Sequence, residues 1–239
     1  MINSLPDLVI ALIFSNLTAA DRIRKLSLVC KRWKEIVYTC AVWKSVDFNW
    51  QRNLTSEILN RFVFAGTREV RLSECCYLRW SDVCIIFKRC KRLDVLELPW
   101  LGYRNEAVPL EFSQLNIRYV HYLNLSHCRV SNSLYSQLAF TCPALSVLLL
   151  QDSQEISEET YRVSRFKGHK QLKLLNVAHN RAALSVSCII ELLKYSNNRV
   201  LLDIRGHHLT EFEFLLIIKE HPDALSRIVD LDDYVDMLY

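Results

Sequence analysis

The stretch Leu93-Asp94-Val95-Leu96-Glu97-Leu98 decides the fold, because its pattern, apolar-x-x-apolar-x-apolar, returns along the chain. The last apolar position of the pattern recurs at residues 48, 72, 98, 125, 150, 177, 204 and 231. The spacings are 24, 26, 27, 25, 27, 27 and 27 residues. A short strand of this kind buries its apolar side chains only when the next copy stacks on it. The spacing therefore predicts a stack of parallel strands.

A period of this size resembles that of leucine-rich repeats, which lies between 20 and 29 residues. That family places Asn or Cys three residues after the strand pattern, where the polar group satisfies backbone groups inside the turn. Leu101 and His207 depart from this rule. Cys90 and the pair Cys142-Pro143 stand at positions that resemble those of the cysteine-containing class of these repeats. We therefore expect both thiols to have a packing role. The residues at the turn position are Cys75, Leu101, Cys128, Ser153, Asn180 and His207.

Helical stretches separate the strand patterns. Ser131 and Ser185 each precede an apolar helical run, and Thr210 with Glu213 forms a capping box. We therefore expect the α/β class. Residues 41–239 are predicted to form a leucine-rich-repeat solenoid of about seven to eight repeats, with a concave parallel sheet and convex helices.

The last repeat permits two registers, with either Ile228 and Asp230 or Val229 and Leu231 pointing inward. The second is predicted, because an inward Asp would lack a partner. The acidic tail from Asp230 to Tyr239 fits three roles: a cover for the last edge, a contact for a basic target, or a solvated end.

Residues 1–40 do not follow this period and are predicted to form three helices. Leu8, Leu12, Ile13 and Leu17 make one apolar helical stripe. Thr18 with Asp21 marks the start of a second helix. The third segment carries Val29, Cys30, Trp33, Ile36 and Val37.

This module resembles the F-box family. The matching elements are Leu5-Pro6-Asp7, Ile13-Phe14-Ser15-x-Leu17, Asp21 and Val29-Cys30-Lys31-Arg32-Trp33. The match covers about residues 4–38, with one extra residue between Asp21 and Cys30 and Leu8 where the family often has Glu. The first strand pattern ends at Phe48, so we expect the F-box at 1–40 and the repeats to be rigidly joined.

The resemblance implies a substrate-receptor subunit of an SCF-type cullin–RING ubiquitin ligase. Its partners would be a Skp-family adaptor, the cullin–RING core and an unidentified protein substrate, and it would have no cofactor and no chemistry of its own. Ubiquitination and proteasomal degradation of the target would follow. Leu17, Val29 and Cys30 fit a core role as well as an adaptor contact. The residues expected to bind the adaptor are Leu5, Pro6, Ile13, Phe14, Leu17, Val29, Cys30 and Trp33.

Side chains between the inward positions should face the concave side, because strand residues alternate. A contiguous apolar patch on such a face usually marks a binding site. The predicted target contacts are Arg71, Glu97, Tyr122, Asn124, Leu149, Gln151, Leu174, Asn176, Asp203 and Arg205.

Composition limits the other functions. A net charge of +4 is too small to favour nucleic acid or an anionic membrane. There is no apolar run of roughly 18 residues and no signal peptide at the start. Nine cysteines, an odd number, then favour a reducing compartment, cytoplasm or nucleus.

Three alternatives compete with a ligase subunit. An enzyme is disfavoured because no phosphate loop, zinc motif or nucleophile elbow appears, and the neighbours His127 and Cys128 fall at repeat positions. A scaffold acting outside ubiquitination stays open, since no sequence feature excludes it. The N-terminal helices as a mere solenoid cap would leave the Leu-Pro and Val-Cys-x-x-Trp elements unexplained.

Overall fold

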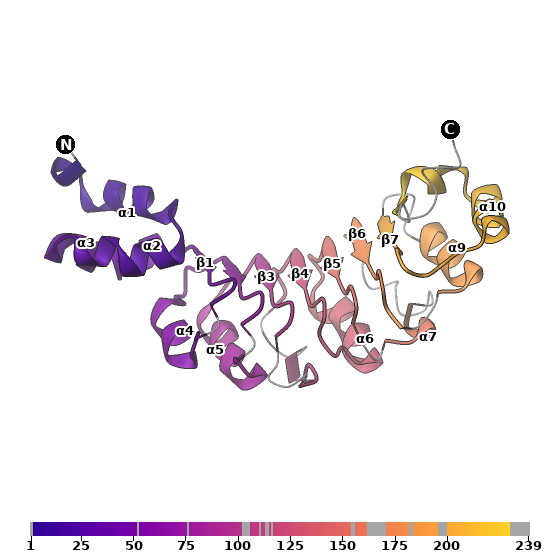
Figure 1. The fold of residues 1–239 in the computed structure, drawn as a ribbon, viewed down its shortest axis with the longest axis horizontal. Helices are drawn as coiled ribbons and strands as arrows, with labels where there is room; N and C mark the ends of the chain where they lie inside the picture. Colours follow the sequence, from indigo (N-terminus) through magenta and orange to yellow (C-terminus); the bar gives the residue numbers. More distant parts are fainter. Residues whose placement is uncertain are drawn as a thin grey trace.

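The computed structural model describes residues 2–229 except 52, 76, 102–105, 110, 113–114, 116, 154–155, 162–170, 182–183 and 196–199. The described residues form an arc with helix α1 (Asp7–Ser15) near one end and helix α10 (Glu211–Glu220) near the other (Figure 1). Strands line the inner side of the arc, and helices line its outer side. In the described ranges, no helix is both long and apolar enough to cross a bilayer.

The first forty residues are helical, as their apolar spacing predicts. Thr18 caps the second helix, because its hydroxyl accepts a hydrogen bond from the Asp21 backbone N–H at 3.1 Å. This confirms the predicted helix start. The elements are η1 (Ile2–Ser4), α1 (Asp7–Ser15), α2 (Ala19–Arg24), η2 (Leu26–Leu28), α3 (Lys31–Val37) and η3 (Cys40–Val42).

One parallel sheet follows, in which each strand pairs with the next strand along the chain. The inward residue at the centre of each strand pairs with its equivalent 24, 26, 27, 25, 27 and 27 residues later. These are the spacings that the sequence pattern predicts for the first six pairs. The strands are β1 (Ser45–Asp47), β2 (Glu69–Arg71), β3 (Val95–Glu97), β4 (Tyr122–Asn124), β5 (Val147–Leu149), β6 (Leu174–Asn176), β7 (Leu201–Asp203) and β8 (Ile228–Val229).

The last strand corrects one prediction. Ile228 pairs with the buried Leu202, and Val229 pairs with Asp203. Equivalent residues of parallel neighbours point to the same side, so Ile228 is the inward residue and the predicted inward Val229 is wrong. Leu231 and the acidic tail lie outside the described residues.

The inward positions build one continuous core from Ile10 of α1 to Ile228 of β8. Burying each Leu or Val contributes about 1.5–3 kcal/mol, and the stacked strands achieve this burial together with the helices that cover them. The buried pattern residues are Trp43, Val46, Phe48, Val70, Leu72, Leu93, Leu96, Leu98, Val120, Leu123, Leu125, Leu145, Leu148, Leu150, Leu172, Leu175, Val177, Leu202 and Ile204.

Helices cover the outer side of the sheet (Figure 1). Ser131 caps α6 by accepting from the Leu134 N–H at 3.2 Å, and Thr210 with Glu213 forms the predicted capping box of α10. The outer elements are α4 (Ser56–Phe62), α5 (Trp80–Arg89), α6 (Asn132–Thr141), α7 (Glu158–Tyr161), α9 (Val186–Tyr195), α10 (Glu211–Glu220) and η5 (Pro222–Ser226).

The six predicted turn positions are buried. At all of them except Leu101 the side chain hydrogen-bonds to backbone groups, as the repeat pattern predicts. Even His207, which departs from the pattern, does so: its Nδ1 accepts from the Leu184 N–H at 3.2 Å. That acceptor requires a neutral ring, and burial lowers the pKa of His207. In four copies the turn side chain forms a hydrogen bond with a backbone carbonyl of the preceding copy, at the residue that ends its strand pattern. These bonds are Cys75 to Phe48 and Cys128 to Leu98 at 3.3 Å, Ser153 to Leu125 at 3.3 Å and His207 to Val177 at 2.9 Å.

The residue just before that position adopts a left-handed backbone in seven successive copies, a feature that the sequence analysis missed. Only the seventh copy has glycine there, with φ of 80°. At the six positions without glycine, the backbone N–H donates a hydrogen bond to a carbonyl of the next copy, which fixes the left-handed conformation. Trp50 N–H, for example, donates to the Ser73 carbonyl at 2.9 Å. We call this set the left-handed row: Trp50, Glu74, Trp100, His127, Asp152, His179 and Gly206.

Arg22 fastens the N-terminal helices to the sheet. Its buried guanidinium donates to carbonyls at the end of α1 and at the start of β1, and lies 4.9 Å from the Trp43 ring centroid. These contacts tie the end of α1 directly to the start of β1. The five acceptors are the carbonyls of Phe14 (3.1 Å), Ser15 (2.7 Å), Leu17 (2.8 Å), Val42 (3.0 Å) and Ser45 (3.2 Å).

Candidate functional site

Helix α1 presents apolar side chains to solvent. Leu8 and Leu12 lie four residues apart on one face of the helix and are 74% and 65% exposed. Ile13 and Leu17 continue this exposed side, while Ile10, Ala11 and Phe14 face the core. The apolar stripe predicted from the sequence is therefore largely surface, and exposed apolar groups of this size mark an interaction site.

Most of the predicted adaptor residues retain accessible surface. Pro6, Ile13, Leu17, Val29 and Cys30 are exposed. Leu5 and Trp33 are half-buried against the core.

Phe14 is the exception, and its placement corrects the prediction. It is 1% exposed, and its ring packs edge-on against Trp33 with centroids 5.0 Å apart. An aromatic ring in the middle of an inward helix face serves the core, so Phe14 has no free surface for a partner. Leu28, which is 80% exposed, was missed because it falls in a 3-10 turn without helical periodicity.

Helix α3 holds the Leu5-Pro6 segment in place. Arg32 donates to the Asp7 carboxylate at 2.7 Å and to the Leu5 carbonyl at 2.6 Å. The Trp33 indole N–H donates to the Asn3 side chain at 2.9 Å. The proline-containing turn is thus positioned by side chains of the Val-Cys-x-x-Trp segment, which lies about 25 residues further along the chain.

The inner face of the sheet carries a second candidate surface. The register aligns the outward side chains at the start of β3 to β7 in one line across the sheet. Four of them are half-buried and Leu201 is exposed. Each is apolar or aromatic, in contrast to the acidic Glu69 at the same place in β2. We call this set the apolar row: Val95, Tyr122, Val147, Leu174 and Leu201.

Charged groups stand beside the apolar row at its β2–β3 end. Arg71 lies between Glu69 and Glu97, at 2.8 Å and 3.0 Å from their carboxylates. Burial alone would lower the pKa of Arg71, but the two glutamates outweigh burial and raise it. Burial and the charge of Glu97 raise the pKa of Tyr122. This end of the face is therefore polar and pre-arranged.

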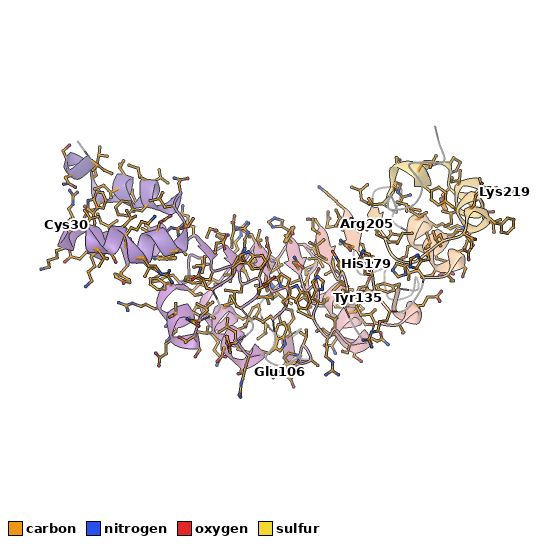
Figure 2. The ribbon with its side chains drawn as sticks, in the orientation of Figure 1. Cys30, Glu106, Tyr135, His179, Arg205 and Lys219 are labelled. Atoms are coloured by element: carbon orange, nitrogen blue, oxygen red, sulfur yellow. The ribbon has the colours of Figure 1, made fainter. Side chains whose placement is uncertain are left out.

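The ten predicted target residues occupy outward strand positions or the turn directly after a strand. Asn124 and Asn176 also have a structural role, because each side-chain oxygen accepts a backbone N–H two residues later. Asp203 corrects its prediction. It is buried, and Asn176 and Arg205 both bind its carboxylate at 2.9 Å, so it offers a partner almost no surface. Arg205 lies near the C-terminal end of the arc and Cys30 at the N-terminal end (Figure 2).

Three thiols are held in their protonated form by burial. Burial raises the pKa of Cys90, Cys128 and Cys142 to about 12 in each case. His127 turns away from Cys128 and pairs with Asp152, at 3.1 Å between Nδ1 and Oδ2. In the part of the chain that the structure describes, no cluster of three His, Cys, Asp or Glu side chains is arranged to hold a metal.

Comparison with known families gives a match over the N-terminal region. The family model for F-box-like domains matches residues 2–49. The matched range contains α1, α2 and α3 and ends just after β1. The match supports the resemblance seen in the Leu-Pro, Ile-Phe-Ser and Val-Cys-x-x-Trp elements.

Proposed function

We propose that this F-box protein is the substrate-recognition subunit of an SCF-type ubiquitin ligase. The F-box-like domain at residues 2–49 suggests adaptor binding, since such domains typically bind Skp-family adaptors. The observation that carries the proposal is the exposed leucine surface of α1 within that domain. A soluble protein gains nothing from exposing Leu8 and Leu12 unless a partner covers them.

The repeats form the second half of the proposal. We interpret residues 41–239 as a leucine-rich-repeat solenoid whose concave face holds a target protein. The strand register, the buried inward positions and the polar turn residues support this interpretation. The apolar row supplies desolvated contact area, and the charges at its β2–β3 end supply orientation.

The proposed mechanism is proximity without chemistry by this chain. The adaptor would link the chain to a cullin–RING core, which brings a charged ubiquitin-conjugating enzyme near target lysines. The gain is effective concentration, and it depends on a rigid connection between the two binding surfaces. Degradation of the target and a cytoplasmic or nuclear location belong to the same proposal.

The test is a reconstitution with purified Skp-family adaptor and cullin–RING core. The double variant Leu8→Glu, Leu12→Glu should bind the adaptor at least about 100-fold more weakly, because hot-spot residues contribute roughly 2 kcal/mol each. Phe140→Glu is the matched control, since Phe140 is an exposed apolar residue on α6. Thermal melts should show that the parent chain, the double variant and the control variant are all folded.

The outcomes separate the alternatives. Undiminished adaptor capture by the folded double variant contradicts the assignment of α1 as the adaptor surface. Capture of the adaptor without the cullin–RING core favours a scaffold that acts outside ubiquitination.

A further inference from the structure

Two tryptophans stand exposed on the left-handed row. Trp50 is 67% exposed and Trp100 is 51% exposed, and both have positive φ, of 65° and 59°. A left-handed backbone disfavours bulky residues, and exposure of an indole gains nothing for the core. The positive φ is common to the whole row, but two exposed indoles in one row point to a contact with a ligand.

One face of the Trp100 ring is covered by a neighbouring side chain. The His127 ring from the next copy stacks on it with 4.1 Å between centroids and 8° between planes, and His127 is held by Asp152. The stacking runs along the row, from one strand to the next. The opposite face of the indole therefore looks back toward the preceding copies, where Glu74 and Trp50 lie.

Glu74 lies between the two tryptophans in the row and also has positive φ, of 58°. It is half-buried, and within the described residues its carboxylate has no hydrogen bond or ion pair. A partly exposed carboxylate without a partner among the described residues can accept hydrogen bonds from a ligand. Its natural counterpart is a cation.

The surrounding charge favours the same ligand. Among the described residues, the outward positions of β1 to β3 and of the turns that follow them hold four carboxylates against one guanidinium, in a chain whose net charge is +4. Trp50 and Trp100 belong to positions two strands apart, separated by roughly 9.6 Å along the sheet, and Glu74 belongs to the copy between them. The charged groups are Asp47, Glu69, Glu74 and Glu97, with Arg71.

We propose that Trp50, Glu74 and Trp100 form a binding site for an arginine side chain of the target protein. A planar guanidinium stacks on an indole face and donates two hydrogen bonds to a carboxylate, whereas an ammonium does neither as well. The assignment of this arginine to the target protein rests on the proposed function. The preference of the site for a guanidinium does not depend on that function.

The test uses the full chain labelled with 5-fluorotryptophan and followed by ¹⁹F NMR. The chain has five tryptophans, so Trp50→Phe and Trp100→Phe assign the two relevant signals and the other three serve as internal references. Acetyl-arginine amide is the probe. We expect saturable shifts at Trp50 and Trp100, and at least fivefold weaker binding of the neutral acetyl-citrulline amide and of acetyl-lysine amide.

Glu74→Gln should weaken arginine binding about fivefold, and Glu57→Gln, an exposed carboxylate on α4, should leave it unchanged. Shifts that do not saturate, equal binding of citrulline or lysine, or an unaffected Glu74→Gln variant would overturn the site. The result is independent of the adaptor assay. A chain that binds arginine here but no adaptor contradicts the proposed function alone, and a chain that binds only adaptor contradicts this site alone.

Discussion

At the scale of single residues, Arg22 joins three segments through the five carbonyls that its guanidinium contacts. Arg22→Lys keeps the charge but offers a compact ammonium with fewer, differently directed donors. We expect the free energy of unfolding to fall by about 3 kcal/mol, from the loss of about three bonds at about 1 kcal/mol each. Urea denaturation measures this.

The control for Arg22→Lys is Arg24→Lys, an exposed arginine on the same helix, which should leave the stability within about 0.5 kcal/mol of the parent. Equal stability of both variants would show that the carbonyl contacts of Arg22 contribute little.

His207 predicts a pH dependence of stability. Burial lowers its folded pKa below the ordinary value near 6.5, so the folded protein binds its proton less readily than the unfolded chain does. The contribution of His207 is therefore fully present above about pH 6.5 and is lost as the pH falls below it. Denaturation midpoints measured from pH 7.5 to pH 5 should decrease.

Replacing His207 by Asn, the residue at the equivalent turn position 180, should flatten that decrease. His208→Asn, at an exposed neighbouring site with positive φ, should retain it. The same slope in both variants would assign the pH dependence to other groups.

At the scale of the elements, the turn after β7 depends on Gly206. A Cβ at this position would lie 2.4 Å from Nδ1 of His179, and its φ of 80° disfavours any side chain. Gly206→Ala should cost about 1–2 kcal/mol of unfolding free energy. Adding His179→Ala should restore the stability lost through the steric clash. A double-mutant cycle measured by urea denaturation then separates the cost of the clash from the cost of the left-handed backbone. Strict additivity would show that only the backbone term operates.

The strands show how far sequence reasoning extends. The period predicts the register of six strand pairs because an inward apolar residue must lie over its equivalent in the next copy. At β8 the alternation is ambiguous, since Ile228 and Val229 are adjacent and both apolar. Only the pairing with Leu202 decides between them.

The candidate sites were less predictable. Phe14 and Leu12 are both apolar members of one helix, and only the packing of α1 on α3 shows that the first is core and the second surface. The left-handed row has no sequence signal, because ordinary residues replace glycine in six of its seven positions. Backbone hydrogen bonds from the next copy impose that conformation, and they exist only after stacking.

At the scale of the whole molecule, the continuous core and Arg22 predict a fixed distance between the N-terminal helices and the end of the arc. Spin labels at positions 35 and 220, both exposed, should give one narrow distance distribution by pulsed electron spin resonance. Labels on non-canonical amino acids avoid the nine cysteines. Arg22→Lys should broaden the distribution, and Arg24→Lys should not. A broad distribution in the parent chain contradicts a rigid connection between adaptor and target surfaces.

The left-handed row also bears on how such a chain can change over generations. Each copy sets the backbone of the one before it, and the side chains differ from copy to copy: an indole stacks on an imidazole, which pairs with a carboxylate. Deleting or duplicating one copy would place side by side two copies whose side chains do not form these contacts. We therefore expect its descendants to diversify by point substitution at a constant number of repeats.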